Sequence, residues 1–200
     1  MNIPLLLSSR NPDKVQEFRE ILSPFNIILH SLLDFPEIPE TVEDADTIHR
    51  NAIKKAMEGA KRTGMLCIAD DTGLFIDALN GDPGVYSARW AGENCSYQDN
   101  RRKILLQMEG INGRDARFET ALVLGDATGL ISVVTGVVKG RISLYERGDM
   151  GFGYDSIFEV EGRRCTYAEM GDEEKNRISH RALAIREMMP TLKRILDIQE

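Results

Sequence analysis

Residues 65–92 read MLCIADDTGLFIDALNGDPGVYSARWAG. The stretch begins with five apolar residues, Met65–Ala69, which are followed at once by Asp70 and Asp71 and then by a Thr-Gly pair. A short apolar run with this ending predicts a buried strand that stops at the two acids. Ligands bind at the carboxyl ends of strands in open α/β sheets, and two adjacent carboxylates repel unless a cation accompanies them. The pair therefore predicts a cation-dependent site, with a solvated turn as the alternative interpretation.

The rest of the chain predicts a mixed α/β fold. Strand patterns alternate with helical patterns in the first half, and a hairpin with its turn at 126–129 follows. We expect one domain, 1–200, with a strongly twisted central sheet and flanking helices that form two lobes around a cleft. Pro190 should kink or split the last helix. The expected strands are 3–7, 26–32, 65–69, 117–124, 130–138 and a short one after 153, and the expected helices are 12–22, 47–62, 96–108 and from 179 onward.

Composition excludes several classes of protein. The 200 residues are 42% hydrophobic and 28% charged, and the net charge is −7, which argues against binding to nucleic acid or to anionic membranes. No apolar run approaches the ~18 residues of a membrane span, and the N-terminus does not read as a signal peptide. Cys67, Cys95 and Cys165 have no metal-ligand spacing and are read as reduced thiols. These features predict a cytoplasmic globular protein.

A polar segment after the first strand is a candidate phosphate site. Asn11 is a good helix N-cap and Pro12 suits the first helical position, so the free N–H groups of this helix start could face an anion. Lys14, one turn in, would add positive charge. A plain capped helix with an exposed lysine is the alternative. The candidate residues are Ser9, Arg10, Asn11, Pro12, Asp13 and Lys14.

A second candidate site consists of carboxylates. Residues 34–46 carry six acids and no base, and Glu43 in this loop could join Asp70 and Asp71. Three converging carboxylates would suit Mg²⁺, a hard cation that takes oxygen ligands and keeps waters for a phosphate substrate. Acidic loops are usually solvated, which is the alternative for Glu43. In the helix that follows, Lys54, Lys55, Lys61 and Arg62 are expected to point outward.

Two further segments carry residues that could bind a base or a phosphate. Aromatic side chains in a glycine-rich loop can stack on a base, and a nearby acid can accept from a ring N–H. Basic groups around a helix start can bind phosphate or donate to a ring oxygen. Core aromatics and a solvated basic turn are the respective alternatives. The residues are Phe152, Gly153, Tyr154 and Asp155 in the loop, and Lys175, His180 and Arg181 at the helix start.

Taken in order, these segments resemble the family of non-canonical purine nucleoside triphosphate pyrophosphatases, the inosine triphosphatase or Ham1-like family. The resemblance spans essentially the whole chain. Its matching motifs are Ser9-x-Asn11-x-x-Lys14, Glu43 with Asn51-Ala52, ADDTGL at 69–74, GxPGVYSARWAG at 81–92, GFGYD at 151–155, and Lys175 with SHRA at 179–182.

The resemblance implies an activity and roles for the candidate residues. It implies a homodimer that uses Mg²⁺ to hydrolyse ITP, dITP and XTP to the monophosphate and pyrophosphate, which would cleanse the nucleotide pool. Asp71 would be the proton acceptor and a metal ligand, with Asp70 and Glu43 completing the acidic site. Ser9–Lys14 would contact the triphosphate and Thr72 the substrate. The loop 152–155 with Lys175, His180 and Arg181 would bind base and phosphates.

Three positions depart from the family pattern. Arg50 stands where the family usually has an acid, Ser156 stands where proline commonly follows GFGYD, and Arg10 stands where a small residue is common. Arg10 could add a phosphate contact. A phosphatase that releases inorganic phosphate and a non-catalytic nucleotide-binding module are the rival functions, and nucleic-acid binding is disfavoured by charge.

Overall fold

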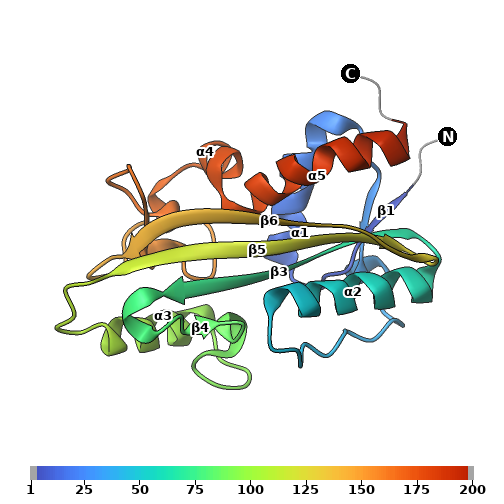
Figure 1. Cartoon of the computed structure of the whole chain (residues 1–200). Helices are drawn as coiled ribbons and strands as arrows, with labels where there is room; N and C mark the ends of the chain where they lie inside the picture. Colours follow the sequence, from blue (N-terminus) through green and yellow to red (C-terminus); the bar gives the residue numbers. More distant parts are fainter. Residues whose placement is uncertain (1–3, 198–200) are drawn as a thin grey trace. The chain divides into compact units, whose positions relative to one another are not determined.

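A mixed sheet with helices around it forms the framework of the protein, as expected from the sequence. The structure is a computed structural model that describes residues 4–197, so Ile3 of the expected first strand lies outside the described residues. The strands are β1 (Leu5–Leu7), β2 (Leu29–Ser31), β3 (Leu66–Ile76), β4 (Pro83–Gly84), β5 (Asp115–Asp126), β6 (Gly129–Ile142) and β7 (Phe158–Val160) (Figure 1). The α-helices are α1 (Pro12–Leu22), α2 (Ile48–Thr63), α3 (Tyr97–Gln107), α4 (Asp172–Ile178) and α5 (His180–Leu196). Short 3₁₀ helices cover Ser23–Phe25, Leu32–Asp34, Asp77–Leu79, Ser87–Arg89, Asp155–Ile157 and Tyr167–Glu169.

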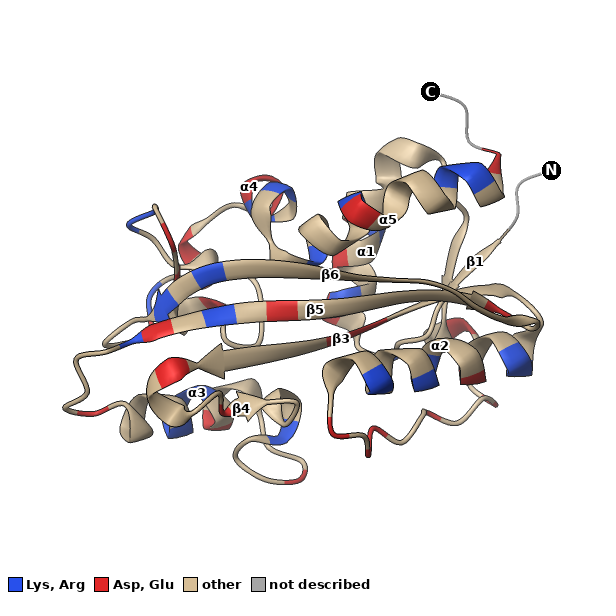
Figure 2. Cartoon of the chain, in the orientation of Figure 1, with Lys and Arg blue, Asp and Glu red and all other residues tan. Residues whose placement is uncertain are grey.

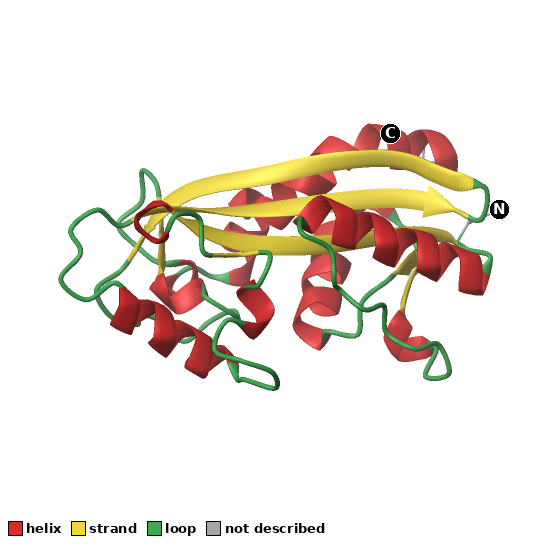
Figure 3. Cartoon of the chain, turned by 60° about the horizontal axis from the view of Figure 1, so that its bottom comes forward, coloured by secondary structure: helices red, strands yellow, loops and turns green. Residues whose placement is uncertain are grey.

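The strand order is β2-β1-β3-β5-β6-β7, and β4 pairs with β3. β1 is parallel to both β2 and β3, whereas β3–β4 and β6–β7 are antiparallel. The long β5 and β6 are neighbours in the sheet and lie side by side in Figures 1 and 3. The hairpin turn forms as predicted, because Asp126 Oδ1 accepts from the N–H groups of Thr128 and Gly129.

The expected end of the strand at the acid pair is wrong. β3 continues through Asp70 and Asp71 to Ile76, so both carboxylates lie in the middle of a strand. The strand can continue because the long strand β5 is its neighbour in the sheet, because β4 pairs with Leu74 and Phe75, and because Gly73 leaves room for β4. A Cβ at Gly73 would lie 2.8 Å from the carbonyl oxygen of Gly84. The acids are therefore held by sheet hydrogen bonding rather than by a turn.

The chain divides into two compact units. Unit 1 comprises the described residues of 4–71, 120–136 and 181–197, and unit 2 comprises 72–119 and 137–180. The expectation of a single domain with two lobes around a cleft stays a prediction.

Unit 1 has a core made from two helices and the sheet. Val15 and Phe18 of α1 and Ile185 and Met188 of α5 pack with β-strand residues such as Ile68 in one buried cluster. The apolar spacing of α1 and α5 brings these side chains to one face of each helix. α5 runs to Leu196 with Pro190 inside it, so the proline does not split the helix.

Unit 2 has an aromatic core. The rings of Phe118 and Phe158 lie 4.6 Å apart between centroids, and those of Phe158 and Tyr167 lie 5.5 Å apart. Such contacts add to the burial of large apolar surfaces. No helix in residues 4–197 is long and apolar enough to cross a membrane.

Candidate active site

The start of α1 lies beside the acid pair because β1 and β3 are parallel neighbours. Leu7, the last residue of β1, is in register with Ile68, so the Ser9–Lys14 segment leaves the sheet near the next residues of β3. Asn11 caps α1, and its Oδ1 accepts from the N–H groups of Asp13 and Lys14 at 2.9 and 3.2 Å. The capped start predicted from the sequence is therefore present, with the Asn11 side chain on the N–H groups that a phosphate would otherwise contact.

Asp70 is fully buried and faces cations rather than another acid. Its Oδ2 lies 3.0 Å from Lys14 Nζ and accepts from Arg181 Nη2 and Nε at 3.1 and 3.2 Å. Lys55 Nζ donates to its backbone oxygen at 2.8 Å. Burial alone would raise the pKa of Asp70, but Lys14, Arg181 and Lys55 outweigh it and hold the pKa well below its usual range. The cations around Asp70 thus favour its ionised form.

Asp71, the next residue, has the opposite electrostatics. It is 6% exposed, and its Oδ2 accepts from Asn51 Nδ2 at 3.1 Å. Burial and the charge of Glu43 raise the pKa of Asp71 to about 6, against the opposing charges of Lys55 and Lys14. A carboxylate with a pKa near neutrality can both accept and release a proton, which is the property a general base needs.

The acidic loop is attached to α2 through basic side chains, which Figure 2 shows recurring along that helix. Lys55 Nζ lies 2.8 Å from Glu43 Oε1, so the expectation that Lys55 points outward is wrong. Its side chain is 8% exposed, because the ammonium group finds both Glu43 and the Asp70 backbone inside unit 1. Burial would lower the pKa of Lys55, but Glu43, Asp70 and Asp71 raise it instead, and Lys55 in turn lowers the pKa of Glu43.

Glu43, Asp70 and Asp71 do not converge as the sequence led us to expect. Among the described residues, no three His, Cys, Asp or Glu side chains form a group that could hold a metal ion. The physical reason is that Asp70 is surrounded by Lys14, Lys55 and Arg181, which occupy its surroundings with positive charge. The charge of Glu43 raises the pKa of Asp71, and the charge of Asp70 acts on the pKa of Glu43 in the same direction.

Arg181 and Arg10 make contacts that the sequence does not reveal. Arg181 is 2% exposed, and its guanidinium pairs with Glu17 of α1 as well as with Asp70. Arg10 donates to the backbone oxygens of Phe35, Pro36 and Ile38, so its guanidinium holds that loop. Both guanidinium groups therefore have partners within unit 1, and the substrate contacts that the sequence suggests for them stay predictions.

The glycine-rich loop of unit 2 is organised by a buried ion pair. Lys175 Nζ lies 2.7 Å from Asp155 Oδ2, and both side chains are 7% exposed. The same Asp155 oxygen accepts from the N–H of Phe152 at 2.8 Å, and Lys175 Nζ lies 4.7 Å from the centre of the Phe152 ring. Asp155 and Lys175 therefore fix the loop that carries Phe152 and Gly153.

Tyr154 and His180 are core residues in unit 2. Tyr154 is 6% exposed and its hydroxyl donates to the backbone oxygen of Ser87 at 2.7 Å, and burial raises its pKa. The His180 ring stacks on Phe118, with centroids 4.6 Å apart. Phe152 and Thr72 remain partly exposed. Ser156 donates to Glu146, which also pairs with Arg101, and Arg101 donates to the Gly153 oxygen.

Three buried polar residues of unit 1 were missed as site residues: Glu17, Asn51 and Lys55. Asn51 and Lys55 lie one helical turn apart, on the same face as Ala52 and Ala56, which are fully buried. Asn51 and Lys55 are polar residues at positions where the spacing of the helix predicts buried apolar ones, and this signal could have identified both. Glu17 lacks such a signal, because its partner Arg181 is 164 residues away in the chain.

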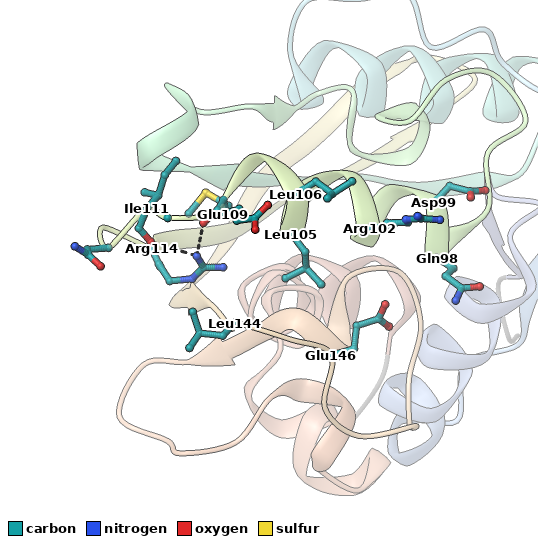
Figure 4. A pocket seen from close by; sticks show the side chains of 13 residues that line it. Gln98, Asp99, Arg102, Leu105, Leu106, Glu109, Ile111, Arg114, Leu144 and Glu146 are labelled. Atoms are coloured by element: carbon teal, nitrogen blue, oxygen red, sulfur yellow. Dashed lines mark hydrogen bonds between the residues drawn. The ribbon is translucent and has the colours of Figure 1, made fainter.

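A cavity of about 660 Å³ in unit 2 contains none of the predicted site residues. Its lining comes from α3 and the segments that follow α3 and β6 (Figure 4). Arg114 in this lining donates to the carbonyl oxygens of Met108, Ile142 and Ser143, which accounts for its burial.

Comparisons with known proteins agree with the resemblance seen in the sequence. The family model described as "Ham1 family" matches residues 5–191. The chain is 42% identical over 198 residues to the dITP/XTP pyrophosphatase of Desulforamulus reducens, covering 98% of each chain. It is 43% identical over 189 residues to the protein of the same name from Bacillus subtilis, covering 94% of this chain and 96% of the relative.

Solved structures show the same fold. A HAM1 protein from Coxiella burnetii superposes with a TM-score of 0.86 at 36% identity, covering 96% of this chain and 99% of the other. A nucleoside-triphosphatase, also titled dITP/XTP pyrophosphatase, from Mycobacterium abscessus gives 0.75 at 42% identity, covering 94% and 100%. With a family model matched from the first strand into the last helix, this chain belongs to the Ham1 family.

Proposed function

We propose that the chain hydrolyses dITP, ITP and XTP to the nucleoside monophosphate and pyrophosphate, with Mg²⁺ as cofactor. One observation carries the proposal. The pKa of Asp71 is raised to about 6 by burial and by the charge of Glu43, although Lys55 and Lys14 oppose the shift. Relatives that are named dITP/XTP pyrophosphatases and match nearly the whole chain support dITP and XTP as substrates and pyrophosphate as a product.

The residues present fit a magnesium ion. Glu43 and Asp71 offer oxygen donors, and the repulsion that raises the pKa of Asp71 would be relieved by a cation. Mg²⁺ is commonly held by one or two carboxylates and completes its coordination with water and substrate phosphates. Glu43 and Asp71 would therefore hold the ion, and Asp70, predicted as a third ligand, would instead order the cations around it. When bound, the ion would polarise the phosphate and offset charge on the leaving group.

The chain's own groups then have distinct roles. Asp71 orients a water molecule and accepts its proton, and the water attacks the α-phosphorus so that the bond to pyrophosphate breaks. Lys14 and the Ser9–Asp13 segment contact the phosphates at the start of α1, with Lys14 exchanging its partner Asp70 for phosphate oxygens. Attack at the α- rather than the γ-phosphorus rests on the relatives' name.

The predicted residues of the 152–155 loop, together with Lys175, His180 and Arg181, would recognise the base. The Phe152–Asp155 loop, held by Lys175, presents a partly exposed aromatic ring against which a base could stack. Thr72, His180 and Arg181 complete the proposed substrate contacts. A donor facing a 6-oxo group disfavours a 6-amino purine, and such a mismatch can discriminate by about 10⁴ or more.

The test is a substrate panel with separate assays for pyrophosphate and inorganic phosphate. The chain is incubated with dITP, XTP, ITP, ATP or GTP and Mg²⁺, without added pyrophosphatase. We expect pyrophosphate as the first product from dITP, ITP and XTP, with far slower turnover of ATP and GTP. Phosphate as the first product would identify a phosphatase, and equal turnover of ATP and ITP would contradict the cleansing role.

We also propose that the protein is a cytoplasmic homodimer without nucleic-acid or membrane partners. Light scattering tests the oligomeric state, and binding assays test the partners.

A further inference from the structure

The side chain of Asn51 links Asp71 to the loop that carries Glu43, the other carboxylate proposed to hold the cation. Asn51 lies in the first turn of α2 and is fully buried. Its Nδ2 donates to Asp71 Oδ2 at 3.1 Å, and its Oδ1 accepts from the N–H of Ala45 at 3.0 Å. A single amide therefore joins β3 to the loop that carries Glu43, two residues before Ala45.

The other contacts of residues 44–46 with α2 lie at the surface. Asp44 pairs with Lys54 at 2.7 Å and Asp46 with Arg50 at 2.8 Å, and the aspartate side chains are 65% and 70% exposed. Exposed pairs of this kind contribute about 0–1 kcal/mol each, and salt screens them. A buried hydrogen bond from a rigid side chain fixes geometry better, so the Asn51–Ala45 contact constrains residues 44–46 more strongly than these exposed pairs do. It acts beside the Lys55–Glu43 ion pair, which holds the Glu43 side chain itself.

The residue type is suited to this position. An amide donates to Asp71 without bringing a charge, whereas a lysine here would compete with a bound cation. The amide oxygen of Asn51 accepts from a backbone N–H, which no cationic side chain could do. Both the donor and the acceptor of the Asn51 amide thus have a partner, and both partners belong to unit 1.

We propose that Asn51 is a positioning residue, which sets the separation of Glu43 and Asp71 and orients the Asp71 carboxylate toward the cation. The inference rests on the proposed function, because it concerns the metal pair of that site. Removing a group that orients a metal ligand typically weakens metal affinity or activity about 10- to 100-fold. The same loss is expected for Asn51→Ala.

The measurement is Mn²⁺ binding to the full chain without nucleotide, followed by electron paramagnetic resonance of free Mn²⁺. We expect Asn51→Ala to weaken Mn²⁺ binding about 10- to 100-fold. Hydrogen exchange of the Ala45 amide, measured without metal, should become faster in the variant. Asn51→Leu, which keeps most of the side-chain volume and removes both hydrogen bonds, should give the same two results and replaces the alanine variant if that fails to fold.

Asn100 provides a matched control. It is 3% exposed and lies at the start of α3, where its Nδ2 donates to the Ala88 oxygen at 3.1 Å and its Oδ1 accepts from the Ala91 N–H at 2.7 Å. Asn100→Ala thus removes a buried amide with two backbone partners in unit 2. We expect it to lower the melting temperature while Mn²⁺ affinity and Ala45 exchange stay at wild-type values.

The outcomes separate this inference from the proposed function. Wild-type Mn²⁺ affinity in both Asn51 variants would overturn it, as would equal weakening by Asn100→Ala, which would indicate general destabilisation. Absence of Mn²⁺ binding by the wild type would overturn it as well. If the wild type binds Mn²⁺ through Asn51-dependent geometry but releases no pyrophosphate, the proposed function fails and the positioning role stands.

Discussion

The charged cluster of unit 1 and the glycine-rich loop of unit 2 bury ionised groups in different ways. In unit 2, Asp155 and Lys175 form a closed pair, and the same carboxylate oxygen also accepts from the Phe152 N–H. In unit 1, Asp70 takes most of the positive charge and Asp71 is left beside Glu43 with a raised pKa. The closed pair stabilises a loop conformation, whereas the cluster leaves one carboxylate with a raised pKa. The proposed function therefore assigns stability to Asp70 and reactivity to Asp71.

The largest effect is expected for Asp71→Asn. Loss of a general base costs about 10²- to 10⁴-fold in rate, and the amide also removes a proposed metal ligand, so pyrophosphate release should fall by at least 10³-fold. Steady-state assays with dITP measure it, and Glu43→Gln serves as the comparison, because it removes a ligand without removing the base. Activity of Asp71→Asn above one tenth of wild type would reassign the base.

The same variant should change stability with pH in a defined direction. The pKa of Asp71 is raised to about 6 in the folded chain, so the folded state binds the proton more tightly than the unfolded state does. Metal-free stability therefore falls as pH rises from about 4 through 6 and then levels off, by up to about 3 kcal/mol. Asp71→Asn should remove this fall, which urea titrations in EDTA measure. A pH dependence identical to wild type would place the raised pKa elsewhere.

Asp70→Asn tests the other acid of the Asp70–Asp71 pair, and the expected change in stability has the opposite sign. The pKa of Asp70 is held low, so its contribution is present above about pH 4 and is lost as pH falls through lower values. Breaking a buried ion pair from one side costs about 3–5 kcal/mol, since Lys14 and Arg181 would lose their shared partner. The free energy of unfolding should drop at pH 7, where Asp71→Asn raises it. Equal signs for the two variants would contradict the division between stability and reactivity.

In unit 2, Lys175→Met tests whether the ion pair acts by fixing the loop. It leaves a buried carboxylate and should cost about 3 kcal/mol, with a raised KM for dITP. Asp155→Asn added to it should recover much of the stability, because neutralising both partners removes the uncompensated charge. Mn²⁺ binding by Glu43 and Asp71 should be retained. Non-recovery in the double variant would show that Asp155 acts mainly through Phe152.

Local patterns in the sequence predicted the elements well and the contacts poorly. The Asn11 cap, the hairpin turn at Asp126 and the start of α3 at Ser96 depend on residues a few positions apart, and all three formed as expected. The predicted end of β3 was wrong because the strand continues beside β5 and then pairs with β4, whose Pro83 and Gly84 carry no strand signal of their own.

The residues of the site contact partners that are far away in the sequence, so no local pattern could predict these contacts. Asp70 meets Arg181 across 111 residues, and Arg181 meets Glu17 across 164. The sequence identified both Asp70 and Arg181 as candidates from motifs, but it assigned Asp70 to metal and Arg181 to substrate. That two candidates pair with each other follows only from the packing of α1, β3 and α5 in one core.

The smallest effect is expected for Arg50→Ala. Arg50 replaces an acid that the family pattern leads one to expect, yet its guanidinium pairs with Asp46, and both side chains are about 70% exposed. An exposed i,i+4 pair contributes about 0.3–0.5 kcal/mol, so both the free energy of unfolding and kcat/KM should stay near wild type. Thr47→Ala is the comparison in the same turn, because its side chain caps α2 by accepting from the Arg50 N–H at 3.2 Å, and its loss should cost about 1 kcal/mol. If Arg50→Ala instead lowered activity tenfold, the surface pairs would hold Glu43 in place, and the buried contact through Asn51 would not be the main constraint on the loop.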